Sequence, residues 1–387
     1  MLTIDEVLTR GVVNVIPEKG ELKKLLESGR KLNVYLGIDP TATRIHLGNA
    51  VPLRKLQKFV ELGHHVTFLI GDFTALIGDT SDKDSERPVL TYEQIQENFK
   101  DYKKQAEKIV DFSKAKVKFN SEWLKNLSFT EVIKLCQRFS FGDFASRELI
   151  KKRLLEGKKV GLHEALYPAM QGYDSYFMDT DIQIGGADQT FNMQTGRVLQ
   201  KDWRDKESFV LVTGYLEGTD GRKMSKSWGN AIWLEDSPEE MFGKVMSVKD
   251  NLIVTFFKLA TDLPLSQAEE VEKRLKDGEN PMIVKTELAL QIVKELHDEK
   301  SAKEAKEKFE STFQKRNFSM DAAEVEKKGT LLEVVQSIKE IGSNSKAKRL
   351  IKDGAVDVDG NVVKDTDFKV SGGEEIKIGK KTFVKVK

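Results

Sequence analysis

The sequence predicts an α/β protein whose first part is built around a parallel sheet. Three observations lead to this prediction. Short apolar strands alternate with amphipathic helices up to about residue 230, only helical patterns follow to about residue 325, and a small segment of mixed character begins at residue 342. The length of 387 residues is enough for two or three domains.

The first elements imply that the sheet is parallel. Apolar residues alternate over 32–38, and Pro40 ends this strand. From Leu47 the apolar spacing becomes helical, and Gly63 is placed to end the helix. Residues 66–70 form the next apolar strand. Because a strand, a crossover helix and a strand of this length form a parallel pair, ligands should bind beyond the carboxyl ends of these strands.

The following elements extend the same domain. A charged helix is predicted over 91–111 and a strand around Val117, after which a mostly helical insertion of about 124–164 interrupts the alternation. The alternation resumes with a strand, a helix and a strand, at 181–184, 189–199 and 209–212. We therefore expect a Rossmann-like domain over residues 1–230.

The remaining residues predict two further domains. Residues 231–325 carry helical patterns only, 326–341 are expected to be a linker, and 342–387 form a small α+β module. In this module, 345–352 has the pattern of a short basic helix that Gly354 ends, and a strand and turn follow.

The composition is that of a globular protein with segregated charge. The 63 basic and 62 acidic residues nearly cancel, but residues 342–387 carry 11 basic and 7 acidic side chains. The single cysteine, Cys136, excludes an internal disulfide and a zinc site of several thiolates. The first residues lack a signal-peptide pattern, and no apolar run reaches the ~20 residues of a membrane span. We expect a cytoplasmic protein.

Two motifs far apart in the sequence together describe an ATP site. The first is the segment 39–49, which contains His46 and Gly48 at the start of a predicted helix, and the second is Lys223-Met224-Ser225-Lys226-Ser227. A Lys-x-x-Lys pair in a loop can close over a pyrophosphate, and a turn that opens a helix can contact the phosphates from the other side. The combination resembles class I aminoacyl-tRNA synthetases.

A second set of residues indicates the amino acid that is activated. Tyr167, Gln171 and Asp174 recur at helical spacing, so they share one face. Together with Tyr35, the segment 77–79 and the segment 183–189, they resemble bacterial tyrosyl-tRNA synthetases. The resemblance implies that the protein activates L-tyrosine with ATP, releases pyrophosphate, and transfers tyrosine from tyrosyl-adenylate to the 3' end of tRNA(Tyr).

The resemblance also assigns roles to individual residues. Tyr35 and Asp174 would bind the phenol hydroxyl of tyrosine, and the rest of the tyrosine site would consist of Asp79, Tyr167, Gln171 and Gln189. The ATP site would consist of Asp39, Thr41, His46, Gly48, Gly186, Asp188, Lys223, Met224 and Lys226. The catalytic set would be His46, Asn49, Lys83, Arg87, Lys223 and Lys226. Magnesium would accompany ATP, with no metal ligand from the protein and no zinc.

The resemblance further implies a tRNA partner and a homodimer. The module at 342–387 is similar to a small RNA-binding module first known from a ribosomal small-subunit protein, and its helix would contact tRNA phosphates through Lys346, Lys348, Arg349 and Lys352. The insertion, over 129–164, would form much of the dimer interface. Taken in isolation, the same basic side chains would more often be a solvated surface, and the sequence of the insertion by itself shows only apolar helical residues.

Three features depart from the family pattern. Asn49 replaces the second histidine often found in the first motif, although its amide can still donate a hydrogen bond. Thr80 and Asp82 stand where proline and glycine are usual, which affects the loop that carries Lys83. Trp228 occupies a position usually held by a smaller apolar residue.

Three alternatives share part of this pattern. A tryptophanyl enzyme would have both ATP motifs but is not expected to carry Tyr35 with Asp174 or the basic module. A small-molecule adenylyltransferase could use the same His-x-Gly-x turn, and an RNA-binding regulatory or splicing protein could retain an inactive synthetase body. The intact lysine loop argues against the last two.

Overall fold

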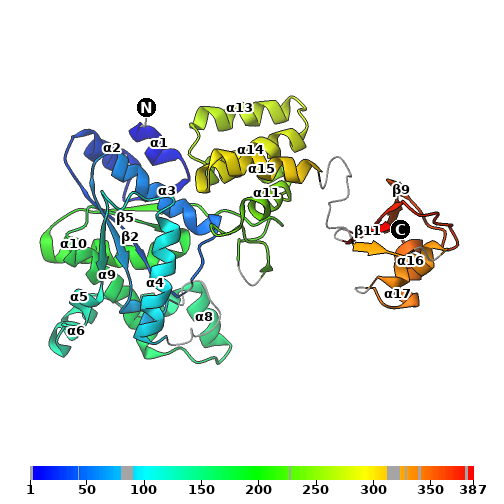
Figure 1. The fold of residues 1–387 in the computed structure, drawn as a ribbon. Coiled ribbons are helices and arrows are strands. Elements are labelled where there is room, and N and C mark those ends of the chain that lie inside the picture. Colours follow the sequence, from blue (N-terminus) through cyan, green and yellow to red (C-terminus); the bar gives the residue numbers. More distant parts are fainter. Residues whose placement is uncertain are drawn as a thin grey trace. The chain divides into compact units, whose positions relative to one another are not determined.

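The chain forms two compact units, residues 1–302 and 303–387, which are described separately (Figure 1). The structure is a computed structural model. It describes residues 3–41, 43–79, 90–225, 228–311, 323–326, 329–338, 341–379 and 382–387.

A six-stranded sheet forms the centre of the first unit. The strands are β1 (Val12–Ile16), β2 (Asn33–Ile38), β3 (His65–Ile70), β4 (Lys116–Phe119), β5 (Ile182–Gly186) and β6 (Phe209–Thr213). Their order is β1-β6-β5-β2-β3-β4, and β2 to β6 run parallel. This confirms the predicted parallel sheet.

Strand β1 was not predicted. It pairs antiparallel with β6 at the edge of the sheet, and its side chains do not alternate between buried and exposed. Val15 is buried but Val13 is 62% exposed, so the strand lacks the apolar periodicity by which the other strands are recognised.

Helices cover the sheet on its faces. They are α1 (Ile4–Thr9), α2 (Lys19–Glu27), α3 (Leu47–Glu61), α4 (Tyr92–Ala106), α9 (Tyr167–Phe177) and α10 (Thr190–Arg204), with short 3-10 turns η1 (Thr74–Leu76), η2 (Leu162–Leu166) and η3 (Ala187–Gln189). Helix α3 packs on β2, β3 and β5, and α9 packs against α10. Helix α3 ends before Gly63, which has a φ of 73° as a left-handed C-terminal residue requires.

The insertion between β4 and η2 is helical, as predicted. It contains α5 (Ser121–Leu124), α6 (Phe129–Cys136), α7 (Phe141–Ser146) and α8 (Glu148–Leu155). Arg153 is 1% exposed and donates to Glu164 of η2 at 2.7 Å and 3.0 Å. A bidentate pair this deeply buried fixes α8 to the segment that leads into α9.

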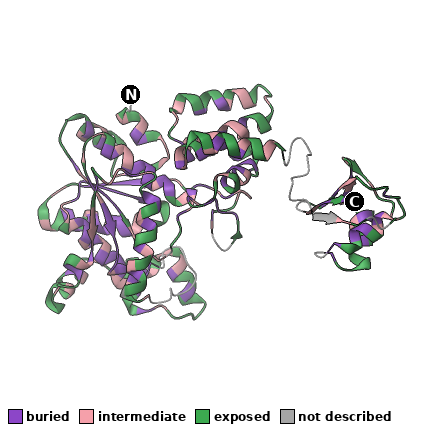
Figure 2. Cartoon of the chain, viewed as in Figure 1, coloured by how far each residue is buried: buried purple, intermediate pink, exposed green. Residues whose placement is uncertain are grey.

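The helical region after β6 packs into the same unit as the sheet. It contains α11 (Pro238–Met246), the turn η5 (Asp250–Leu252), α12 (Ile253–Ala260), α13 (Leu265–Lys276), α14 (Pro281–Leu296) and α15 (Glu299–Phe309), the last of which crosses the boundary between the units. Helix α11 packs on α14, and α12 packs on both α14 and α3. In Figure 2 the buried residues of the unit concentrate in the strands and on the inner faces of the helices.

The second unit has its own sheet and core. Its elements are β7 (Ala323–Val325), α16 (Leu331–Ser337), α17 (Asn344–Lys352), β8 (Val356–Val358), β9 (Asn361–Val362), β10 (Glu375–Ile378) and β11 (Thr382–Val386). The strand order is β7-β11-β10-β8-β9. Leu331, Val334 and Val335 of α16 are fully buried with Ile351 of α17 in one hydrophobic core.

The position of α16 corrects the predicted linker. Residues 326–341 were expected to connect two domains, but α16 belongs to the core of the second unit. The amphipathic spacing of Leu331, Val334 and Val335 gives this seven-residue helix a buried face, which a linker would not need.

None of the helices that the structure describes is long and apolar enough to cross a membrane.

Candidate active site

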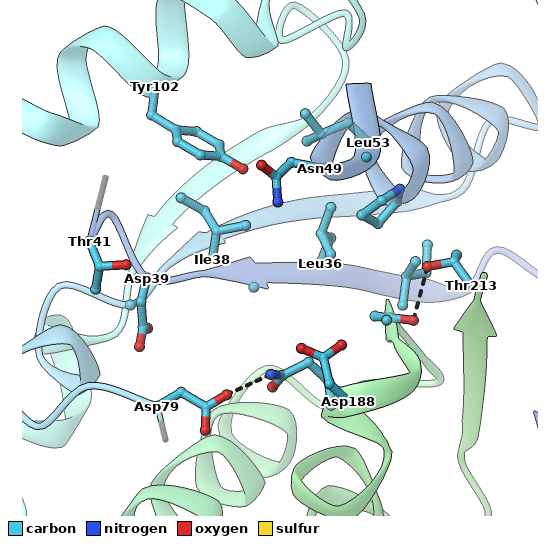
Figure 3. Close-up of a pocket in the computed structure, with 18 of the residues that line it drawn as sticks. Leu36, Ile38, Asp39, Thr41, Asn49, Leu53, Asp79, Tyr102, Asp188 and Thr213 are labelled. Atoms are coloured by element: carbon cyan, nitrogen blue, oxygen red, sulfur yellow. Dashed lines mark hydrogen bonds between the residues drawn. The ribbon is translucent and has the colours of Figure 1, made fainter. Parts of the chain in front are cut away.

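A cavity of about 1050 Å³ opens at the carboxyl ends of the parallel strands, where ligand binding was predicted. In Figure 3 the side chains of Asp39, Asp79 and Asp188 lie around this space, with Asn49 and Tyr102 across from them. The structure brings together here every described residue of the predicted tyrosine, ATP and catalytic sets. These are Tyr35, Asp39, Thr41, His46, Gly48, Asn49, Asp79, Tyr167, Gln171, Asp174, Gly186, Asp188, Gln189, Lys223 and Met224.

Part of the predicted site lies outside the described residues. Lys83, Arg87 and Lys226 belong to this part, as do the departures at Thr80 and Asp82.

Asp174 is the most deeply buried acid of the cavity. It lies on α9, is 2% exposed, and accepts hydrogen bonds from Trp123 Nε1 at 2.7 Å and Asn120 Nδ2 at 3.1 Å. Burial outweighs these two donors and raises the pKa of the carboxyl to about 8. Sequence reasoning missed both donors, although Asn120 directly follows β4, at the edge of the sheet where ligand-binding residues are expected.

Tyr35 faces the same buried region from β2. Its hydroxyl donates to Gln183 Oε1 at 3.1 Å, and burial, together with the charge of Asp174, raises its pKa well above the usual range. Gln183 is fully buried on the neighbouring strand β5, and its amide nitrogen donates to the carbonyl of Met193. The phenol of Tyr35 therefore stays protonated, and Gln183 is a second residue that the sequence did not single out.

Asp39, which follows β2, is hydrogen-bonded to residues of α9 and η1. Its carboxylate accepts from the hydroxyls of Tyr167 at 2.8 Å and Thr74 at 2.7 Å. The pair with Thr74 needs glycine at position 71, because a Cβ there would lie 2.0 Å from Asp39 Oδ1. At the adjoining wall, Gln189 Nε2 donates to Asp79 Oδ2 at 2.6 Å.

His46 and Asn49 cap the first turn of α3. The Asn49 backbone N–H donates to His46 Nδ1 at 3.2 Å, and the Asn49 side-chain oxygen accepts from the backbone N–H of His46 at 3.5 Å. Burial lowers the pKa of His46 to about 4, so the ring is neutral and carries its proton on Nε2. Asn49 accepts through its oxygen, which leaves its amide nitrogen as the donor, so this departure from the family pattern keeps the cap.

An antiparallel β-bridge joins the first ATP motif to the segment that follows the lysine loop. Leu47 N–H donates to the carbonyl of Ile232, and Leu234 N–H donates to the carbonyl of Ile45, both at 2.9 Å. The His46 ring also packs against Trp233, with 5.6 Å between ring centroids. The motif after β2 and the segment after the lysine loop are therefore held in register.

Asn230 organises the described part of the lysine loop. It is 3% exposed, its oxygen accepts from the Ser225 N–H at 2.9 Å, and its nitrogen donates to Asp220 at 2.7 Å and to the Lys223 carbonyl at 3.2 Å. The Arg222 guanidinium lies 4.6 Å from the ring centre of Trp228, which gives this unusual tryptophan a cation–π partner.

The predicted RNA-binding side chains share the exposed face of α17. Lys346, Lys348, Arg349 and Lys352 are exposed, while Ala347 and Ile351 are buried. The basic residues therefore lie on the exposed face of α17, and the opposite face packs into the core of the second unit.

Within the described ranges, no group of three or more histidine, cysteine, aspartate or glutamate side chains is placed to hold a metal ion.

Comparisons with known families match both units. Residues 27–314 match the family described as tRNA synthetases class I (W and Y), and residues 331–376 match the S4 domain. The tyrosine–tRNA ligase of Thermotoga maritima is 40% identical, over 98% of this chain and 96% of that protein. The tyrosine–tRNA ligase of Carboxydothermus hydrogenoformans is 41% identical, over 98% and 97%.

Solved structures show the same fold. A tyrosyl-tRNA synthetase from Archaeoglobus fulgidus in complex with L-tyrosine is 26% identical, has a TM-score of 0.62, and matches 79% of this chain and 100% of its own. A C-terminally truncated mitochondrial tyrosyl-tRNA synthetase from Aspergillus nidulans has a TM-score of 0.67 at 20% identity, over 80% of this chain and 93% of its own.

Proposed function

The chain belongs to the class I tRNA synthetases of the tryptophan and tyrosine group, and we propose how its cavity carries out the reaction of a tyrosine–tRNA ligase. It activates L-tyrosine with ATP to tyrosyl-adenylate and pyrophosphate and then transfers tyrosine to tRNA. Nearly full-length identity of about 40% to tyrosine–tRNA ligases, together with the S4 domain, favours tyrosine over the tryptophanyl alternative.

The observation that carries the residue assignment is the pairing of Asp174 and Tyr35 at the buried end of the cavity. The phenol of bound tyrosine would donate to Asp174 and accept from Tyr35, whose proton can turn from Gln183 to the substrate. Phenylalanine would leave both partners without a hydrogen bond. Tyrosyl-tRNA synthetases are themselves the known example of such selection, by a factor of about 10⁵, a property of the family that the geometry explains and does not predict. The α-ammonium of tyrosine would bind among Asp79, Tyr167, Gln171 and Gln189.

The phosphates would lie at the opposite end, near the two ATP motifs. The neutral His46 ring and the Asn49 amide would donate to the phosphate chain, with Thr41 beside them, while Asp39 and Asp188 would bind the sugar side of the adenylate. Gly48 keeps this surface low, because a Cβ there would lie 3.1 Å from the His46 ring. Gly186 and Met224 would complete the adenosine site.

The chemical step needs no protein nucleophile. The carboxylate of tyrosine attacks the α-phosphorus of ATP and displaces pyrophosphate, so catalysis depends on positioning and on stabilising the charge that develops. We assign this stabilisation to Lys223, with Lys226, Lys83 and Arg87. Magnesium would enter bound to the phosphates rather than in a protein site, and no zinc is required.

Further proposals concern assembly and organisation. The insertion exposes Phe129, Phe141, Leu155 and Leu162 to between 62% and 79%, which favours a homodimer formed through this region. We propose that residues 1–230 are the catalytic domain and 231–325 the helical anticodon-region domain, with the basic face of α17 bound to tRNA. A cytoplasmic location fits this role.

Tyrosine-dependent exchange of pyrophosphate into ATP tests the function. We expect exchange with tyrosine and none with tryptophan. Exchange that requires tryptophan would indicate the tryptophanyl alternative, exchange that requires another acceptor an adenylyltransferase, and a complete lack of exchange an inactive RNA-binding relative.

A further inference from the structure

The described residues that line the cavity include more acidic than basic side chains. The acids are Asp39, Asp79, Asp174 and Asp188, which are assigned above to tyrosine and to the sugar side of the adenylate. Among the described lining residues, the basic side chains are Arg44 and Lys223. Lys223 belongs to the lysine loop, whereas Arg44 lies within the first ATP motif and has no role assigned above.

We propose that Arg44 is a further substrate-binding residue that contacts the phosphate chain of ATP and the pyrophosphate that leaves. The inference rests on the proposed function, in which this end of the cavity holds the phosphates.

The backbone on both sides of Arg44 is fixed by one buried side chain. Gln105 of α4 is 1% exposed, its oxygen accepts from the Ile45 N–H at 2.7 Å, and its nitrogen donates to the Thr43 carbonyl at 2.6 Å. The side-chain amide of Gln105 therefore makes the two hydrogen bonds that a neighbouring strand would make with the backbone of residues 43 and 45. Earlier on the same helix, Asn98 Nδ2 donates to the Pro40 carbonyl at 2.9 Å.

The other edge of the same segment pairs with the chain beyond the lysine loop. The Ile45 carbonyl accepts from Leu234 N–H at 2.9 Å, so residue 45 is held from both edges. Gln105 is in this way a positioning residue: it fixes where the side chain of Arg44 begins without lining the cavity itself.

The guanidinium of Arg44 lies against an aromatic ring and makes only long ion pairs. It lies 4.5 Å from the ring centre of Trp233, and its nitrogens are 3.6 Å from carboxylate oxygens of Glu235 and Asp236. Asp236 is held more closely by Lys244 at 2.7 Å. Toward the residues that the structure describes, the Arg44 guanidinium donates no hydrogen bond, and its side chain is 42% exposed.

Arg44 converges with the other phosphate-end residues. Trp233, on which Arg44 lies, also packs against the His46 ring, and the charge of Lys223 helps to lower the pKa of His46. Three donors from two segments, the first ATP motif and the lysine loop, therefore surround one end of the cavity. A planar guanidinium can donate two parallel hydrogen bonds to a phosphate, which would replace its long contacts with the two carboxylates.

The test compares Arg44→Gln with the wild type in tyrosine-dependent exchange and in the reverse reaction of tyrosyl-adenylate with pyrophosphate. We expect KM for ATP and for pyrophosphate to rise about tenfold, while KM for tyrosine changes less than about twofold. Because the side chain is half exposed, the difference should shrink as KCl is raised from about 0.05 to about 0.5 M.

Arg204→Gln is the matched control. Arg204 also lies over an aromatic ring, 4.4 Å from the centre of Tyr176, and has a long ion pair of 3.9 Å with Asp179, but it does not line the cavity. It should leave all three KM values unchanged. Arg44→Lys keeps the charge and should keep KM for ATP within about threefold of the wild type.

Several results would overturn the inference. These are an unchanged KM for pyrophosphate in Arg44→Gln, an equal rise of KM for tyrosine, or the same effect from Arg204→Gln. Wild-type exchange with tyrosine establishes the function in the same assay, so any of these results refutes the role of Arg44 alone.

Discussion

The cavity of the first unit and the basic face of α17 in the second use charge in opposite ways. In the cavity, the carboxyl groups of Asp174 and Asp39 are held by partners from distant segments, so each has one position. On α17 four basic side chains project from an exposed helix face. The cavity should therefore discriminate by geometry and resist salt, whereas α17 should supply affinity that depends on salt.

Separating the units should give the largest effect. Every described residue of the cavity lies within 1–302, so a chain that ends at Ser311, after α15, should form tyrosyl-adenylate at a near wild-type rate. Its kcat/KM for charging tRNA should fall about 10³-fold, because the truncation removes every contact of the second unit with tRNA, including the phosphate contacts of α17. The rate of adenylate formation is measured in single turnovers, and kcat/KM for charging tRNA is measured at the same ionic strength. Equal charging by the truncated and full chains would contradict the division of roles.

Within the cavity, Lys223→Ala should have the next largest effect. If Lys223 stabilises the departing pyrophosphate, kcat for adenylate formation should fall by a factor of about 10²–10³, with tyrosine affinity nearly intact. Lys201→Ala, which removes an exposed ion pair with Asp205 on α10, is the control. A large loss of tyrosine binding with an unchanged chemical step would assign Lys223 to a different role.

Selection of tyrosine over phenylalanine should weaken in Asp174→Ala and Tyr35→Phe. The loss of a charged partner should cost ~1.5–3 kcal/mol and the loss of a neutral partner ~0.5–1.5 kcal/mol, so Asp174→Ala should be the more damaging. The measurement is the tyrosine-to-phenylalanine ratio of kcat/KM for adenylate formation. If both variants keep the wild-type ratio, the phenol does not bind between these two residues.

Neutralising α17 should have a smaller and salt-dependent effect. With Lys346, Lys348, Arg349 and Lys352 all changed to glutamine, tRNA affinity should fall about tenfold at low salt, and the slope of log K against log[salt] should flatten. Folding should be retained because these side chains are exposed. An unchanged slope would show that other residues contact the phosphates.

The smallest effect is expected on the stability of the fold. It comes from the raised pKa of Asp174. Its folded-state value of about 8 lies above the usual 3.8, so the folded chain binds the extra proton between these values. Stability should therefore fall as pH rises through this range, with a slope of at most about 1.4 kcal/mol per pH unit, and level off above the folded-state pKa. Urea unfolding of the unliganded wild type and of Asp174→Asn measures this. The same pH dependence in both proteins would mean that Asp174 is not the group that titrates.

The sequence by itself determined the local elements and the reactive side chains. Alternation over 32–38 and helical spacing from Leu47 depend on neighbours a few residues apart, and β2 and α3 appeared where these patterns lie. The predicted residues between 35 and 224 that the structure describes line one cavity because parallel strands end at a common edge. Apolar periodicity does not predict an element that lacks regular alternation, such as β1, or one in which the helical spacing is too short, such as α16.

Only the tertiary structure decided which partner holds each of these side chains. Asp39 and Tyr167 are 128 residues apart, Asp174 is held by Trp123 from 51 residues away, and Gln105 fixes the segment around Arg44 from 60 residues away. No periodicity encodes such pairs, since a hydrogen bond depends on where packed helices and strands bring two groups and not on their spacing along the chain. The positions of Asn120, Gln183 and Asn230 follow from that packing, and so does the loose hold on Arg44 from which its role in phosphate binding is inferred.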